Sequence, residues 1–225
     1  MTNEQLANGE VRAVIFDYGG VLMRTIDPTP RRELERRLGL PPGGATKLVF
    51  ESLLWNEVQL GRVSSAEFWA DVGQRAELSA EGLAKFRRTF WAGDRLDEEL
   101  VALIRHLRDE GYRTALLSNA PTSLPQHLER LGIADAFEVV VVSGCEGLMK
   151  PDPAIFHLTL ERLGVEPQQA VFVDDMVHNV DAARELGIHT VQFVDLATSL
   201  AELEALLGHP IQISKPGIGG KCYDI

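Results

Sequence analysis

Residues 11–22 read VRAVIFDYGGVL, a mostly apolar and β-branched run that ends in an aspartate, a tyrosine and two glycines before Val21 and Leu22. Its first half, Val11–Phe16, is nearly continuous in apolar residues, which is typical of a strand covered on both faces of a parallel sheet. Four later runs have the same character, and these are Arg113–Leu117, Glu138–Val142, Ala170–Val173 and Ile188–Phe193. The sequence therefore predicts a parallel sheet of short strands.

Stretches with helical spacing precede or separate the last four runs. Leu96–Glu110 places four leucine and isoleucine residues on one stripe and stops before Gly111, a position typical of the residue that follows a helix. Ala154–Leu163 and Asn179–Leu186 stop before glycines in the same way. Strands that alternate with helices over short connections indicate a doubly wound, Rossmann-like α/β fold.

The first run breaks this rhythm, because the second predicted strand begins only at Arg113. The interval contains four amphipathic helix candidates, which are Pro30–Leu38, Ala45–Val58, Ser64–Glu77 and Ala80–Trp91. At about 150 residues per domain, a chain of this length can hold a core and a small second unit. We therefore predict an α/β core of residues 1–22 and 95–225, with an all-helical cap domain at 23–94.

Composition excludes several classes of protein. The chain has 225 residues, of which 45% are hydrophobic and 24% charged, the usual balance of a globular protein. Its formal net charge of −11 argues against nucleic-acid and anionic-membrane partners, which favour basic patches. Two cysteines, no long apolar run and an N-terminus without a signal-peptide pattern favour a cytoplasmic protein.

Polar residues stand where the predicted strands end. Asp17 follows the first strand, Ser118-Asn119 the second, and Asp174-Asp175 the fourth, while Lys150-Pro151 lies in the loop after the third. Taken one at a time, these residues have ordinary interpretations as helix caps, turn residues or a solvated lysine. Because parallel strands present their carboxyl ends at one edge of the sheet, we expect all of them to meet there.

Three carboxylates at one edge repel one another unless a cation lies among them. Two unit charges about 4 Å apart cost about 1 kcal/mol in water and about 4 kcal/mol at an effective dielectric constant of 20. Carboxylates, carbonyl oxygens and water are the ligands that suit Mg²⁺, which takes few protein ligands and keeps several waters. The cluster therefore predicts a Mg²⁺ site.

The order of these residues resembles the four motifs of the haloacid dehalogenase-like (HAD) hydrolase superfamily. The motifs are Asp17 with Val21, Ser118-Asn119, Lys150-Pro151 and Asp174-Asp175, and the pattern spans residues 11–195. The predicted insert matches the helical cap that this superfamily carries in its first position. The sequence is most similar to the subgroup of haloacid dehalogenases, epoxide hydrolase phosphatase domains and sugar-phosphate phosphatases.

The resemblance implies a role for each acidic residue. Asp17 would be the nucleophile and would form an aspartyl-phosphate. Mg²⁺ would be held by Asp17, by the main-chain carbonyl of Gly19, and by Asp174 or Asp175. The metal and cationic groups would offset the repulsion between a carboxylate and a phosphate dianion.

The resemblance also assigns the other polar residues. Ser118 and the backbone amide of Asn119 would donate hydrogen bonds to the phosphoryl oxygens of the substrate. Lys150 would act in catalysis and in substrate binding, as a point charge between the nucleophile and the phosphoryl group. Asn179 would support the site by orienting the acidic pair or the Lys150 amine.

One position departs from the family pattern. Most phosphatases of this superfamily have a second aspartate two positions after the nucleophile as general acid and base, and here that position is Gly19. Such help is typically worth about 10²–10⁴-fold in rate. Three explanations stay open: a substrate with a good leaving group, a proton from another residue such as Asp27 or His178, or a protein with weak or no activity.

These observations favour a Mg²⁺-dependent phosphatase that hydrolyses a small phosphorylated metabolite, such as a sugar phosphate, as a monomer or homodimer. The alternatives are a non-enzymatic or weakly active binding protein and a 2-haloacid dehalogenase. A dehalogenase needs an arginine near the halide, and Arg24 is the only one close to the first loop. A phosphoacceptor receiver domain is excluded, because its acidic pair follows the first strand.

Overall fold

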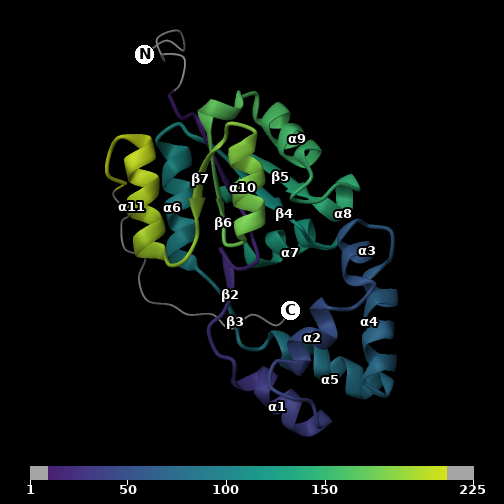
Figure 1. Ribbon diagram of the computed structural model, residues 1–225. Coiled ribbons are helices and arrows are strands. Elements are labelled where there is room, and N and C mark those ends of the chain that lie inside the picture. Colours follow the sequence, from purple (N-terminus) through teal and green to yellow (C-terminus); the bar gives the residue numbers. More distant parts are fainter. Residues whose placement is uncertain (1–9, 212–225) are drawn as a thin grey trace.

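A computed structural model describes residues 10–211 and contains a five-stranded, fully parallel sheet (Figure 1). The strand order is β5-β4-β1-β6-β7, so β1 lies at the centre between β4 and β6. The strands are β1 (Ala13–Phe16), β4 (Arg113–Ser118), β5 (Val139–Val142), β6 (Ala170–Asp174) and β7 (His189–Gln192). The prediction of a Rossmann-like α/β sheet is confirmed.

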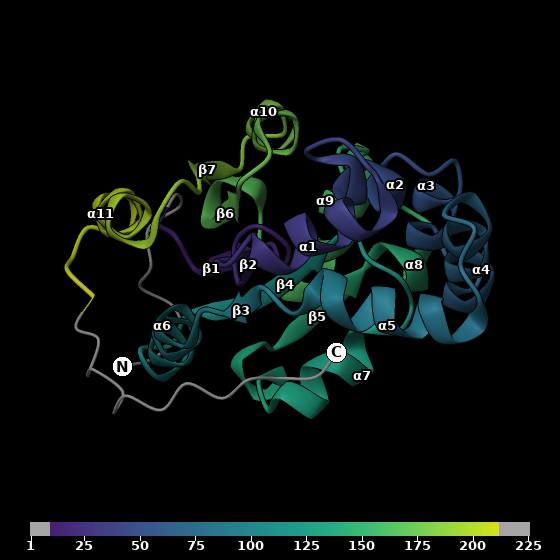
Figure 2. The same ribbon diagram turned by 90° about the horizontal axis from the view of Figure 1, so that it is seen from below.

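Helices cover both faces of this sheet, as expected for strands without an exposed face (Figure 2). On one face, alternate residues such as Val14 and Leu116 pack against α6 (Glu98–Asp109), α7 (Leu124–Leu131) and α11 (Leu196–Leu207). On the other face, their neighbours pack against α9 (Pro153–Leu163) and α10 (Val177–Glu185). Shorter elements complete the core: α8 (Ser143–Glu146), η1 (Ala134–Ala136) and η2 (Pro167–Gln169).

Five helices between β1 and α6 form a separate hydrophobic cluster, which we call the helical insert (Figures 1 and 2). They are α1 (Thr29–Leu38), α2 (Gly44–Phe50), α3 (Trp55–Gln59), α4 (Ser65–Arg75) and α5 (Ala80–Trp91). Aromatic rings fill its interior, with Phe50 contacting Trp55, Phe90 and Trp91 edge to face. The predicted capping box of Ser64 and Glu67 is present at the start of α4.

The continuous helix expected over Ala45–Val58 is wrong, because the chain forms α2 and α3 with a turn between them. Ser52 provides the physical reason. Its hydroxyl oxygen accepts a hydrogen bond from the backbone N–H of Leu54 at 3.2 Å, and its hydroxyl group donates to Asp71 at 2.9 Å. Serine side chains compete with the helical backbone in this way.

Two short strands that the sequence did not indicate connect the insert to the core. β2 (Met23–Thr25) and β3 (Asp94–Leu96) pair antiparallel, so the chain enters and leaves the insert side by side. Asp94 accepts hydrogen bonds from Thr25 and Arg31, and Asp97 caps α6 while pairing with Arg24. The insert is therefore attached through one two-stranded connection.

The structure also bears on the membrane-spanning segments and cysteines considered in the sequence. Among residues 10–211, the structure contains no helix that is both long and apolar enough to cross a membrane. Cys145 is a free, exposed cysteine. Cys222 and the N-terminal segment on which the cytoplasmic prediction partly rests lie outside the described residues.

Candidate functional site

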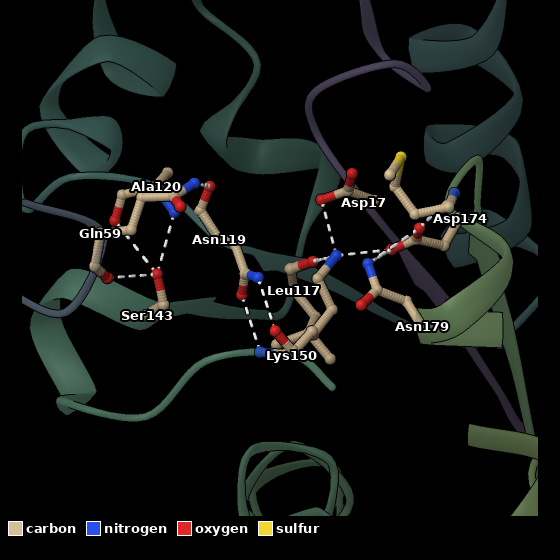
Figure 3. A network of polar contacts seen from close by, with 10 residues as sticks. Asp17, Gln59, Leu117, Asn119, Ala120, Ser143, Lys150, Asp174 and Asn179 are labelled. Atoms are coloured by element: carbon tan, nitrogen blue, oxygen red, sulfur yellow. Dashed lines mark hydrogen bonds and ion pairs between the residues drawn. The ribbon is translucent and has the colours of Figure 1, made fainter. Parts of the chain in front are cut away.

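The structure brings most of the predicted polar residues together at the carboxyl edge of the sheet, and Figure 3 shows Asp17, Lys150 and Asp174 among them. Asp17 directly follows β1, Ser118 ends β4 and Asp174 ends β6. The backbone N–H of Asp17 donates to the carbonyl oxygen of Val173 at 2.9 Å, which fixes the first loop against β6. All three side chains belong to buried residues, with exposed fractions of 6%, 3% and 0% in the same order.

Lys150 is the cation of this cluster. Its Nζ lies 2.8 Å from Asp17 Oδ1, 2.6 Å from Asp174 Oδ2 and 2.9 Å from the carbonyl oxygen of Leu117. The residue is only 1% exposed, so its three N–H donors have protein acceptors instead of water. A buried ammonium group is tolerated when it is paired and hydrogen-bonded in this way.

Burial and charge set the pKa values of the cluster. Burial is the main cause that raises the pKa of Asp17 to about 6, with a further contribution from the charge of Asp174. Burial and then the charge of Asp174 also raise the pKa of Asp175. Burial opposes the charged form of Lys150, but the neighbouring Asp17 and Asp174 carboxylates outweigh it and raise the pKa of the amine. The Lys150 ammonium group therefore stays charged, whereas burial disfavours the ionised forms of Asp17 and Asp175.

Asp174 is held rigidly by the helix that follows it. The Asn179 side-chain amide in α10 donates to both carboxylate oxygens of Asp174 at 3.1 Å, and the Met176 backbone N–H donates to Oδ1 at 2.8 Å. The sequence left open whether Asn179 orients the acidic pair or the Lys150 amine. Among the described residues, its side-chain hydrogen bonds go to Asp174, the first member of the acidic pair.

The Asn119 side chain contacts the Lys150 backbone, which the sequence does not indicate. It accepts a hydrogen bond from the Lys150 backbone N–H and donates one to the Lys150 carbonyl oxygen, both at 2.8 Å. This paired contact fixes the backbone from which the Lys150 side chain extends. Asn119 therefore connects the loop after β4 to the loop that carries the lysine.

The donor set fits a divalent cation. Carboxylate oxygens of Asp17, Asp174 and Asp175 lie within 4.8 Å of one another. Asp175 Oδ1 is buried and has no hydrogen-bond partner among residues 10–211, so an acceptor there is unsatisfied. Three carboxylates face one ammonium group, and a bound Mg²⁺ would balance the two remaining negative charges.

Gly20 makes this arrangement possible. Its φ of +85° is favourable only for glycine, and a Cβ atom there would lie 2.3 Å from Asp175 Oδ2. Gly20→Ala should displace the Asp175 carboxylate and weaken Mg²⁺ binding by at least about tenfold, the range seen when ligand-orienting groups are removed. Isothermal titration calorimetry with Mg²⁺ measures this change.

Gly39→Ala is the matched control for Gly20→Ala. Gly39 also has a positive φ, +64°, but a Cβ atom there has no neighbour within 4 Å. Both variants carry the backbone strain, whereas only Gly20→Ala carries the collision with Asp175. Equal Mg²⁺ affinity in the two variants would show that Asp175 does not need the space beside Gly20.

The side chains named as replacements for the missing acid lie in different places. Asp27 is exposed and accepts a hydrogen bond from the Thr29 backbone N–H at the entrance to α1. His178 is exposed on α10. At Gly19 itself, a Cβ atom would have no neighbour within 4 Å. The loop after β1 therefore has space for a Cβ atom at position 19.

Two buried polar residues beside the site were missed in the sequence. Ser143 begins α8 directly after β5, and Gln59 ends α3 in the helical insert. Both contact the loop at Asn119 and Ala120. Ser143 was identifiable, because it follows a strand at the same edge of the sheet. Gln59 had no signal in the sequence that distinguished it from other helical residues.

Comparisons with known proteins agree with this geometry. A family model described as haloacid dehalogenase-like hydrolase matches residues 11–187. A phosphoglycolate phosphatase from Yersinia pseudotuberculosis is 30% identical over 79% of this chain and 78% of its own length. Acyl-CoA dehydrogenase family member 10 from mouse is 33% identical over 91% of this chain, which spans only 20% of that protein.

A solved structure supports the fold independently. A HAD family enzyme from Bacteroides thetaiotaomicron, crystallised as a mutant in complex with magnesium and inorganic phosphate, superposes with a TM-score of 0.66. It is 23% identical, and the match covers 80% of this chain and 92% of the other. The family model covers most of the chain, so this chain belongs to the haloacid dehalogenase-like hydrolase family.

Proposed function

We propose that this enzyme is a Mg²⁺-dependent phosphatase that cleaves a small phosphorylated metabolite through an aspartyl-phosphate on Asp17. The observation that carries the proposal is the pairing of buried Lys150 with both Asp17 and Asp174, with Asp175 alongside. A cluster with this charge fits a divalent cation and a phosphoryl dianion together. The phosphatase among its relatives supports the same reaction type.

In the first step, a carboxylate oxygen of Asp17 forms a bond to phosphorus, and the bond from phosphorus to the leaving oxygen breaks. Lys150 contacts Asp17 through Oδ1, so its charge lies beside the reacting group. Ser118 and the backbone amide of Asn119 are proposed to donate hydrogen bonds to the phosphoryl oxygens. Water then hydrolyses the acyl phosphate, which releases inorganic phosphate and regenerates Asp17.

Asp17, the Gly19 carbonyl oxygen, and Asp174 or Asp175 are proposed to hold the Mg²⁺ ion. When bound, the metal supplies positive charge that stabilises the charge developing on the phosphoryl oxygens. Asn179 keeps the Asp174 carboxylate in one orientation for this purpose. We further propose that residues 23–94 act as a cap that excludes water from the reacting groups.

The experiment is an assay of the purified protein with p-nitrophenyl phosphate and a panel of phosphorylated metabolites, with Mg²⁺ and with a chelator. We expect turnover that requires Mg²⁺. Tight binding of phosphorylated compounds without turnover would favour the binding-protein alternative. Halide release from 2-chloropropionate would favour a dehalogenase, but Arg24 is already paired with Asp97 and stacked over Phe193.

The Gly19→Asp variant tests the missing proton donor. A Cβ atom at position 19 has no neighbour within 4 Å, so the substitution introduces no collision at that atom. A general acid helps most when the leaving group is a poor one, so kcat on an alkyl phosphate should rise by at least about tenfold, within the usual range of such catalysis. Turnover of p-nitrophenyl phosphate, with its good leaving group, should change much less.

Gly19→Asn is the matched control, since it has the same shape and cannot donate a carboxylic proton. If kcat on alkyl phosphates stays the same in both variants, the leaving group already receives its proton from another residue. That outcome would contradict the inference that position 19 limits the rate.

A further inference from the structure

A buried glutamine of the helical insert contacts the core. Gln59, the last residue of α3, is only 6% exposed. Its side-chain amide donates to the carbonyl oxygen of Asn119 at 2.6 Å, while its own carbonyl oxygen accepts a hydrogen bond from Ser143 Oγ at 2.5 Å (Figure 3). Both partners lie at the carboxyl edge of the sheet, Asn119 in the loop after β4 and Ser143 at the start of α8.

Ser143 extends this contact to the next residue of the same loop. Its Oγ accepts a hydrogen bond from the Ala120 backbone N–H at 2.9 Å, and the residue is fully buried. Gln59 and Ser143 therefore satisfy the carbonyl group of Asn119 and the N–H of Ala120, two successive backbone groups. Buried backbone groups that lose their partners cost free energy, so the loop depends on this contact.

Glycines allow the backbones to approach closely here. Gly61 has a φ of +69°, and a Cβ atom there would lie 2.1 Å from the Gly144 carbonyl oxygen. A Cβ atom on Gly144 would lie 2.8 Å from the Ala120 carbonyl oxygen. We call the contact between Gln59–Gly61, Asn119–Ala120 and Ser143–Gly144 the cap junction. It is a close contact between backbones, with no space for a Cβ atom at Gly61 or Gly144.

The cap junction is continuous with the candidate active site. The Asn119 backbone carbonyl oxygen accepts a hydrogen bond from the Gln59 side-chain amide. The Asn119 side chain is hydrogen-bonded to the backbone N–H and carbonyl oxygen of Lys150. The Lys150 ammonium group in turn contacts Asp17. Figure 3 shows this sequence of contacts from Gln59 to the carboxylate, in which each residue touches the next.

We propose that Gln59 is a positioning residue, which makes the alignment of Asn119 and Lys150 depend on a docked helical insert. This inference rests on the proposed function. Gln59 acts through Asn119 and does not itself carry a reacting atom. By thermodynamic reciprocity, a phosphoryl group that binds beside Asn119 and orders its loop also favours the docked insert.

The test compares Gln59→Leu with the wild-type enzyme. Leucine fills a similar volume but has no amide to donate to Asn119. We expect kcat for p-nitrophenyl phosphate to fall by about tenfold, as for the loss of one buried hydrogen bond, with KM changed less than about twofold. We expect amide hydrogen exchange of residues 118–121 and 143–145 to become faster by a similar factor, with strands β1 and β6 unchanged.

Gln74→Leu is the matched control, since Gln74 is an exposed residue on α4 of the same insert. Gly61→Ala is a second variant, in which the added Cβ atom collides with the Gly144 carbonyl oxygen and forces the two sides of the cap junction apart. It leaves the Gln59 side chain unchanged. Both junction variants should show the faster local exchange and the lower kcat, and the control should show neither. Circular dichroism verifies that each variant folds.

The outcomes separate this inference from the proposed function. A wild-type enzyme without turnover on any phosphate ester refutes the function, and the exchange rates of residues 118–121 then decide alone whether Gln59 orders the loop. If Gln59→Leu has the kcat and exchange rates of Gln74→Leu, Gln59 is not a positioning residue, even when the wild-type enzyme is an active phosphatase.

Discussion

We expect Asp17→Asn to reduce turnover of phosphate esters by at least about 10⁴-fold, as removal of a covalent nucleophile does in other enzymes. An asparagine amide does not form the acyl phosphate that the proposed reaction requires. The Lys150 ammonium group keeps Asp174 and the Leu117 carbonyl oxygen as acceptors, so the cluster remains largely paired. Steady-state kinetics with p-nitrophenyl phosphate and Mg²⁺ measures the effect.

The same variant should be more stable than the wild type in the absence of Mg²⁺. The pKa of Asp17 is raised from 3.8 to about 6, so the folded protein binds this proton more tightly than the unfolded chain. The resulting stability is fully present below about pH 3.8 and is lost as the pH rises through about 6. At pH 7.5 the ionised carboxylate therefore disfavours folding, and asparagine removes that penalty.

We expect Tm to rise by about 2–4 °C at pH 7.5, the usual response of a chain of this size to about 1 kcal/mol. Asp135→Asn serves as the control, because Asp135 is an exposed partner of Arg105 far along the chain from the acidic cluster. A drop in Tm together with a modest loss of turnover would mean that Asp17 has a structural role.

Lys150→Met should have the opposite effect on stability. Methionine has a similar length but no charge, so Asp17 and Asp174 would lose their shared cation in a buried site. Removing one partner of a buried ion pair typically costs about 3–5 kcal/mol. Chemical denaturation without Mg²⁺ should show a loss of this size, whereas the exposed control Lys85→Met should lie near the wild type.

Turnover of Lys150→Met should fall by about 10²–10³-fold, as when a preorganised group that stabilises the developing charge is removed. Added Mg²⁺ should restore part of the stability, because the cation compensates the same carboxylates. It should not restore turnover. If Lys150→Met is as stable and as active as Lys85→Met, the ammonium group has neither the structural nor the catalytic role assigned to it.

The opposite stability changes that we expect for these variants have one cause. Three carboxylates share one ammonium group, so removal of a carboxylate should stabilise the metal-free fold and removal of the lysine should destabilise it. The burial that raises the pKa of Asp17 and Asp175 also makes the site ready for a divalent cation. Under the proposed function, this loss of stability accompanies affinity for a divalent cation.

The central sheet was predictable because its strands are buried on both faces. A run such as Val11–Phe16 has few polar residues, and this composition alone indicates a parallel strand with helices on each side. The positions of Asp17, Ser118 and Asp174 followed from the same logic, since strand ends in such a sheet converge. The candidate site was therefore visible as soon as the strands were identified.

The connection and the contacts of the insert were not predictable in the same way. β2 and β3 have only three residues each, and their pairing depends on the tertiary arrangement of Arg31, Asp94 and Thr25. The break between α2 and α3 depends on the single Ser52 hydroxyl. Gln59 acquires its role only because α3 docks on the core, a contact between residues far apart in the sequence.

The most direct test of the account identifies the residue that receives the phosphoryl group. The enzyme is mixed with substrate and Mg²⁺, quenched in acid during turnover, and treated with tritiated borohydride, which reduces an acyl phosphate and labels that residue. We expect label on the peptide that contains Asp17 and none in the Asp17→Asn variant. Label on the peptide of Asp174 and Asp175, or turnover without any labelled carboxylate, would contradict it.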